Sequence, residues 1–89
     1  MPKPILYIKP GCPWCTDALD YFRRKQVALD VRDVIASATE SRDLLACSGQ
    51  SKCPTFKYGA QVKADFGVDE FEVWAKARPE LCQEIGLKL

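Results

Sequence analysis

Two cysteines separated by two residues, Cys12 and Cys15, are the residues in this chain best suited to chemistry. They follow a short apolar run, residues 5–8, and open an amphipathic stretch, so we expect them where a strand turns into a helix. The first turn of a helix gathers unpaired backbone N–H groups and a partial positive charge, which stabilise a thiolate. Because the thiolate is the reactive form of cysteine, this position favours redox chemistry.

The same spacing also occurs in zinc sites, so the pair alone leaves metal binding open. The sequence contains no histidine, and no second pair of cysteines has this spacing. Both absences argue against zinc, and we therefore expect no metal site and no bound cofactor. Without histidine, catalysis has to come from thiols, carboxylates or backbone dipoles.

Length and charge limit the classes of function. The 89 residues predict one domain, residues 1–89, and 47% of them are hydrophobic, enough for a small core. The 13 basic and 12 acidic residues give a net charge of +1, so nothing indicates a nucleic-acid partner. Only four apolar residues precede Lys9, too few for a signal peptide or a membrane span.

The five cysteines cannot all pair within one chain, because their number is odd. Many cysteines without an export signal are typical of a reducing compartment, so we expect a cytoplasmic protein with free thiols.

The apolar spacing predicts a strand at residues 4–8 and a helix from Pro13 to about Lys25. We expect five further elements after these. They are a strand at 27–34, a helix from Ser37 to Ser48, a hairpin at 54–58 and 61–64, a helix starting near Asp69 and a short helix between Pro79 and Gly86. The order β-α-β-α-β-β-α, with a terminal extra turn, indicates an α/β protein with a four-stranded mixed sheet and flanking helices. This is the thioredoxin-like arrangement.

Three local patterns predict further features of the chain. Alternation along 27–34 places Val27, Leu29 and Val31 on a buried face. Asp69 is expected to cap its helix. Finally, Cys15 shares a helical face with Leu19 and Phe22, which predicts a buried Cys15 and a solvent-facing Cys12. We therefore expect Cys12 to be the nucleophile and Cys15 the resolving thiol.

Three segments, residues 9–15, 50–56 and 67–69, resemble a glutaredoxin of the dithiol type. They contain Lys-Pro-Gly-Cys-Pro-Trp-Cys, Gln-Ser-Lys-Cys-Pro-Thr-Phe and Gly-Val-Asp, and the similarity spans nearly the whole chain. The resemblance implies a monomeric glutathione-dependent oxidoreductase that reduces protein disulfides and glutathionylated proteins. Cys12 would form a mixed disulfide with glutathione, which Cys15 could resolve. The residues expected to contact glutathione are Lys9, Trp14, Gln50, Cys53, a cis Pro54, Gly67, Val68 and Asp69.

The chain also departs from that family's usual pattern. Lys52 and Cys53 stand where Thr-Val is common, Phe66 replaces a glycine, and Val68 replaces a small polar residue. We expect the surface around Trp14, Lys52 and Phe66 to select the protein target. Two alternatives stay open: an electron donor reduced by thioredoxin reductase, and a [2Fe–2S] carrier, which Pro13 disfavours by resemblance.

The remaining cysteines have both ordinary and functional interpretations. Cys47 and Cys82 fall on helices, where packing explains them. Cys53 is either a small buried residue or a third thiol close to Cys12. It could act there as a redox partner or a metal ligand, and pairing of Cys47 with Cys53 is also open.

Overall fold

The computed structural model describes residues 3–89; Met1 and Pro2, which the predicted domain includes, lie outside the described residues. Along this part of the chain the elements are β1 (Ile5–Ile8), α1 (Pro13–Arg24), β2 (Asp30–Asp33), α2 (Ala38–Ser48), β3 (Thr55–Tyr58), β4 (Gln61–Lys63), α3 (Val68–Lys76) and α4 (Pro79–Ile85). Each predicted element is present in the predicted order.

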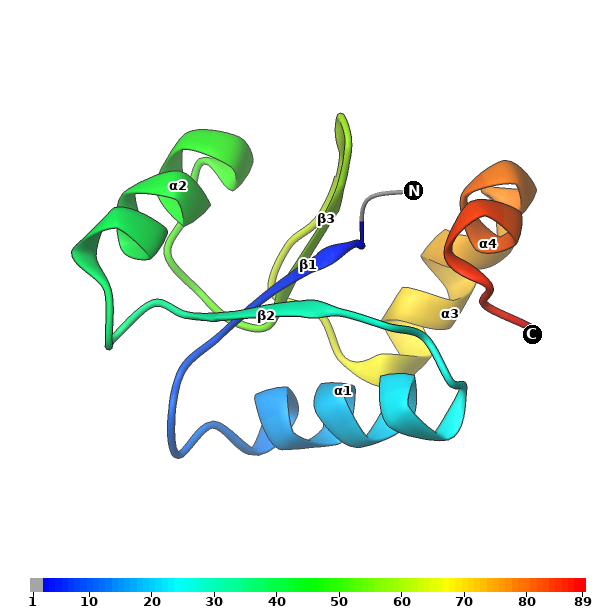
Figure 1. The fold of residues 1–89 in the computed structure, drawn as a ribbon, viewed down its shortest axis with the longest axis horizontal. Coiled ribbons are helices and arrows are strands. Elements are labelled where there is room, and N and C mark those ends of the chain that lie inside the picture. The colour runs from blue at the N-terminus through cyan, green and yellow to red at the C-terminus, as the bar shows by residue number, and fades with distance from the viewer. Residues whose placement is uncertain (1–2) are drawn as a thin grey trace.

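The strands form one mixed sheet in the order β2-β1-β3-β4. β1 runs parallel to β2, with Leu6 opposite Val31, and antiparallel to β3, with Leu6 opposite Phe56. β3 and β4 make the predicted hairpin around Gly59. Figure 1 shows α2 on one side of the strands and α1 with α3 on the other. The predicted thioredoxin-like fold is confirmed.

The main core lies between the sheet and the pair α1 and α3. Leu6 and Phe56 point into it from the strands, and both are fully buried. The ring of Phe56 stacks on Phe22 of α1 at 5.8 Å and meets Phe71 of α3 edge-on at 5.0 Å. Such aromatic pairs add to the stabilisation from area burial, and they fix α1 against the sheet.

A second, smaller core lies on the α2 side of the sheet. Tyr7 alternates with Leu6 along β1 and so points to this opposite face, where it packs with Leu44 of α2. The same cluster contains Cys15 and Cys53. The second core therefore holds two thiols next to the end of β1.

Two helices begin and end as their sequences predict. Ser37 caps α2, its Oγ accepting a hydrogen bond from the Glu40 amide at 3.4 Å. Gly49 follows that helix with φ = 71°, the left-handed conformation that glycine adopts at low cost. At α1, Cys12 is the N-cap and Pro13 the first helical residue.

Three expectations were wrong in detail. β2 covers only Asp30–Asp33, and Val31 is 46% exposed because β2 lies at the edge of the sheet. Asp69 is not the cap of α3; the cap is Gly67, whose amide donates to Glu70 Oε1 at 3.3 Å. Phe66 is 2% exposed, since its ring packs on Phe71, and so offers little surface to a target.

Among residues 3–89, no helix combines the length and the apolar character that crossing a membrane requires.

Candidate active site

Cys12 lies at the start of α1, where the helix offers unpaired amides. Its Sγ accepts a hydrogen bond from the backbone N–H of Cys15 at 3.3 Å, which is the capping interaction of this helix. The residue is partly buried, so the sulfur is neither enclosed in the core nor fully surrounded by solvent. A negative charge that develops on this sulfur would face the positive end of the α1 dipole.

The loop before β3 reaches the same sulfur from the other side. Cys12 Sγ donates to the carbonyl oxygen of Cys53 at 3.8 Å, and Cys53 is joined to Pro54 by a cis peptide bond. Cys53 itself is 6% exposed, and Pro54 is buried. The fold thus brings Cys53 and Pro54 to Cys12, although the two cysteines are 41 residues apart.

Cys15 is 2% exposed, as the helical spacing predicted. Burial raises the pKa of its thiol to about 12, and a hydrogen bond with Cys12 acts in the same direction. A hydrogen bond from the Lys9 backbone opposes the rise. At neutral pH, Cys15 is therefore a protonated thiol held against Cys12.

Lys9, the last residue before the turn at Pro10, lies near the same group of thiols. Burial raises the pKa of the Cys53 thiol, and the positive charge of Lys9 partly counteracts that rise. Lys9 is therefore a cation that favours the thiolate form of Cys53.

A groove begins at Trp14, next to the cysteine pair, and has a volume of about 410 Å³. Its lining residues are Trp14, Asp17, Gly67, Val68, Asp69 and Glu70. The Trp14 ring, 61% exposed, passes so close to Gly67 that a Cβ there would lie 3.3 Å from Trp14 Cζ3. Four predicted ligand residues, Trp14 and residues 67–69, thus meet in one groove.

Two residues of this groove, Asp17 and Glu70, were not predicted. Asp17 is three residues after Trp14 on α1, so helical spacing alone could have identified it. Glu70 directly follows Asp69 in the first turn of α3. With Asp69 they make the wall of the groove negative.

Gln50 makes its hydrogen bonds within its own loop. Its amide nitrogen donates to Ser48 Oγ at 2.7 Å and to Thr55 Oγ1 at 3.1 Å. Its amide oxygen accepts from the Lys52 backbone N–H at 2.6 Å. The side chain thus ties together the loop that carries Cys53, and its polar atoms are occupied by that loop.

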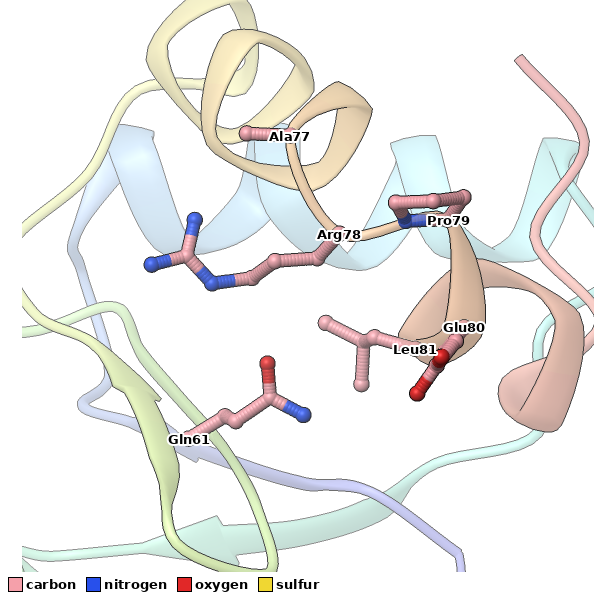
Figure 2. A pocket seen from close by; sticks show the side chains of 6 residues that line it. All are labelled: Gln61, Ala77, Arg78, Pro79, Glu80 and Leu81. Atoms are coloured by element: carbon pink, nitrogen blue, oxygen red, sulfur yellow. The ribbon is translucent and has the colours of Figure 1, made fainter.

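A different pocket, shown in Figure 2, lies between β4 and the start of α4. Arg78 stacks over the Trp74 ring, with its guanidinium carbon 4.3 Å from the ring centre, and donates to the Trp74 carbonyl at 2.9 Å. This pocket contains none of the predicted site residues.

Within the part of the chain that the structure describes, no three side chains of His, Cys, Asp or Glu are grouped to hold a metal ion. The cysteines at positions 12, 15, 47, 53 and 82 are all free thiols.

Comparisons with known proteins agree with the fold. A family model described as glutaredoxin matches residues 5–63. The thioredoxin-like protein BC3987 is 25% identical, with a TM-score of 0.72 over 80% of this chain and 97% of its own. A glutaredoxin from Archaeoglobus fulgidus, 16% identical, has a TM-score of 0.73 over 85% of this chain and 88% of its own.

A glutaredoxin from Brucella melitensis, 22% identical, aligns with all of this chain and 96% of its own at a TM-score of 0.66. No curated protein matches the chain in sequence.

Proposed function

The chain belongs to the glutaredoxin family, and we propose that it is a glutathione-dependent oxidoreductase that reduces protein disulfides and protein–glutathione mixed disulfides. Membership in this family supports thiol–disulfide oxidoreductase activity. The observation that carries the proposal is the contrast between the two thiols. Cys12 is partly exposed and hydrogen-bonded at a helix start, whereas Cys15 beside it is buried and protonated.

In the first step, the Cys12 thiolate attacks the glutathione sulfur of a protein–glutathione disulfide. The bond between glutathione and the protein sulfur breaks, so the protein sulfur leaves as a reduced thiolate that takes up a proton, while Cys12 becomes disulfide-bonded to glutathione. A second glutathione thiolate then attacks the glutathione sulfur of that adduct. Oxidised glutathione leaves, and the Cys12 thiolate is restored. The Cys15 amide that donates to Cys12 Sγ would stabilise the departing thiolate.

For a protein disulfide, Cys15 supplies the second thiol. Cys12 forms a mixed disulfide with the substrate, and Cys15 attacks Cys12, which releases the reduced substrate and leaves a disulfide between Cys12 and Cys15. Glutathione then opens that disulfide. Because Cys15 is protonated at neutral pH, its proton has to leave before or during its attack.

We propose that glutathione lies between the Cys53–Pro54 loop and the groove at Trp14. The γ-glutamyl amine would face Asp69 on the negative wall, and the glycine carboxylate would face Lys9. Gly67 and Val68 form the floor beside Trp14. In this proposal Gln50 acts indirectly, by holding the loop, since its polar atoms already have partners.

The test is turnover of a glutathionylated peptide by glutathione, glutathione reductase and NADPH. We expect activity in the wild type and in Cys15→Ser, and none in Cys12→Ser. Loss of activity in both variants would contradict the roles given to the two cysteines. An inactive wild type would contradict glutathione dependence itself.

A second candidate is an electron donor reduced by thioredoxin reductase. The occupied polar atoms of Gln50 favour it, because they remove one expected glutathione contact. Reduction of the disulfide between Cys12 and Cys15 separates the two candidates. If thioredoxin reductase with NADPH reduces it and glutathione does not, the donor function is correct.

We further propose that the protein works as a monomer in the cytoplasm, with no bound cofactor. The many cysteines of this short chain support a reducing compartment, in which thiols stay free. Gel filtration of the reduced protein tests the monomer.

A further inference from the structure

A third thiol borders the cysteine pair. Cys53 belongs to the buried cluster that contains Cys15, and Cys12 packs against that cluster. The Cys12 sulfur hydrogen-bonds to the carbonyl oxygen of Cys53 itself, so the Cβ of Cys53 is three bonds from the contacted atom. Cys12 is therefore flanked by Cys15 on its own helix and by Cys53 on the loop opposite.

Charge interactions among these residues agree with that placement. A charge on Cys12 raises the pKa of the Cys53 thiol, and a charge on Cys53 raises the pKa of Cys15. The charges of Asp33 and Asp65 also disfavour the Cys53 thiolate, whereas the charge of Lys9 favours it. Lys9 therefore offsets part of the penalty for forming a thiolate at Cys53.

We propose that Cys53 is a second resolving thiol, able to form a disulfide with Cys12 in place of Cys15. The inference deepens the proposed function and rests on Cys12 being the attacking thiol. It gives a buried residue at the active-site loop a role in the reaction.

The step is a thiol–disulfide exchange. The Cys53 thiol loses its proton to solvent, and its sulfur attacks the Cys12 sulfur of a mixed disulfide. A bond forms between Cys12 and Cys53, the bond between Cys12 and the bound thiol breaks, and that thiol leaves in reduced form. No electrons enter or leave overall, because the exchange only transfers the disulfide. Glutathione can then reopen the bond between Cys12 and Cys53.

The other two cysteines are less well placed. Cys47 packs against the same cluster, but its sulfur donates to the Leu44 carbonyl at 3.5 Å and is thus turned toward its own helix. Cys82 lies on α4 and donates to the Ala75 carbonyl at 3.3 Å. Cys82→Ser is therefore a matched control that removes a thiol away from this cluster.

The experiment uses the reduced full chain of Cys15→Ser, in which Cys53 is the remaining cysteine whose backbone contacts the Cys12 sulfur. The protein is oxidised with diamide, which takes two electrons and two protons from a pair of thiols and needs no glutathione site. Free thiols are then alkylated, and the disulfide is located by peptide mapping. We expect a bond between Cys12 and Cys53 in Cys15→Ser and in Cys15→Ser with Cys82→Ser.

In Cys15→Ser with Cys53→Ser, or with Cys53→Ala if serine disturbs folding, that bond cannot form. We expect the diamide adduct on Cys12 to persist more than about tenfold longer there, because the intramolecular attack is removed. An equally short-lived adduct in that double variant, or a bond from Cys12 to Cys47 in Cys15→Ser, would overturn the proposal. So would an adduct that persists in Cys15→Ser.

A parallel reaction with oxidised glutathione separates the two proposals. If diamide produces the bond between Cys12 and Cys53 but Cys12 never accepts glutathione, the proposed function fails and the second resolving thiol stands. If Cys12 accepts glutathione but Cys53 never displaces it, the proposed function stands and the second resolving thiol fails.

Discussion

The sulfur of Cys12 lies 3.8 Å from the backbone carbonyl oxygen of Cys53, so the start of α1 and the loop before β3 meet at one reactive atom. The capping amide of Cys15 contacts the same sulfur at 3.3 Å. Local sequence supplies the helix start, but only the paired strands β1 and β3 bring the loop to it. The chemistry and the fold therefore depend on the same few contacts.

Replacing Cys12 by serine should separate capping from catalysis. Serine is a favoured N-cap residue, so α1 keeps its first-turn hydrogen bond. We expect the free energy of unfolding of Cys12→Ser to stay within about 0.5 kcal/mol of wild type while turnover disappears. Urea unfolding measures the free energy of unfolding, and turnover of the glutathionylated peptide is measured on the same preparation. A large loss of stability would mean that the missing activity reflects misfolding.

Alkaline pH should destabilise the reduced protein. The folded-state pKa of Cys15 is about 12, above its ordinary value of 9.0, because burial penalises the thiolate. Burial likewise raises the pKa of Tyr7, from 10.0 to about 12. The pKa values of Cys15 and Tyr7 are higher in the folded state than in the unfolded state. Their contribution to the free energy of unfolding is therefore complete below about pH 9 and is lost as pH rises toward 12.

We therefore expect the free energy of unfolding to fall between about pH 9 and pH 11, and to fall less steeply in Cys15→Ala. Urea unfolding under a reducing agent measures it. Equal slopes in the two proteins would contradict the burial argument for Cys15.

Gly67→Ala should narrow the groove. The new Cβ would lie 3.3 Å from Trp14 Cζ3, so the ring has to shift. Because φ at Gly67 is −94°, alanine fits the backbone without strain. We expect KM for the glutathionylated peptide to rise about 3- to 10-fold with kcat little changed. An unchanged KM would show that the substrate does not use this side of Trp14.

The hydroxyl of Tyr21 links α1 to α3 by donating to Glu72 Oε2 at 3.0 Å. Removing it in Tyr21→Phe should lower the free energy of unfolding by about 1 kcal/mol, the typical net value of one hydrogen bond. Tyr58→Phe on β3 leaves this bond in place and serves as the control. A similar loss in both variants would assign the effect to removal of a tyrosine hydroxyl in general rather than to the bond with Glu72.

The order of elements could be predicted because each carried a local signal. Ser37 and Gly49 marked the two ends of α2, and Cys12 with Pro13 marked the start of α1. The burial of Cys15 followed from helical periodicity alone. The exposure of Val31 was not predicted, because alternation along 27–34 cannot reveal that Val31 belongs to an edge strand.

The site was predicted less completely, because it depends on contacts between distant segments. The family resemblance predicted that Trp14 and Gly67 both contact glutathione. Only the folded chain shows that the Trp14 ring lies against Gly67. The internal bonds of Gln50 depend on how residues 48–55 turn, which no periodic pattern encodes. Phe66 looked like a surface residue by resemblance, and packing against Phe71 made it part of the core.

The most direct test of the account is to trap the adduct of Cys12. Reduced protein with Cys15→Ser and Cys53→Ser, which lacks both proposed resolving thiols, is mixed with a glutathionylated peptide and quenched by alkylation. Peptide mapping by mass spectrometry then locates the bound thiol. We expect glutathione on Cys12 and release of the reduced peptide. Glutathione on another cysteine, or the peptide on Cys12 in place of glutathione, would contradict it.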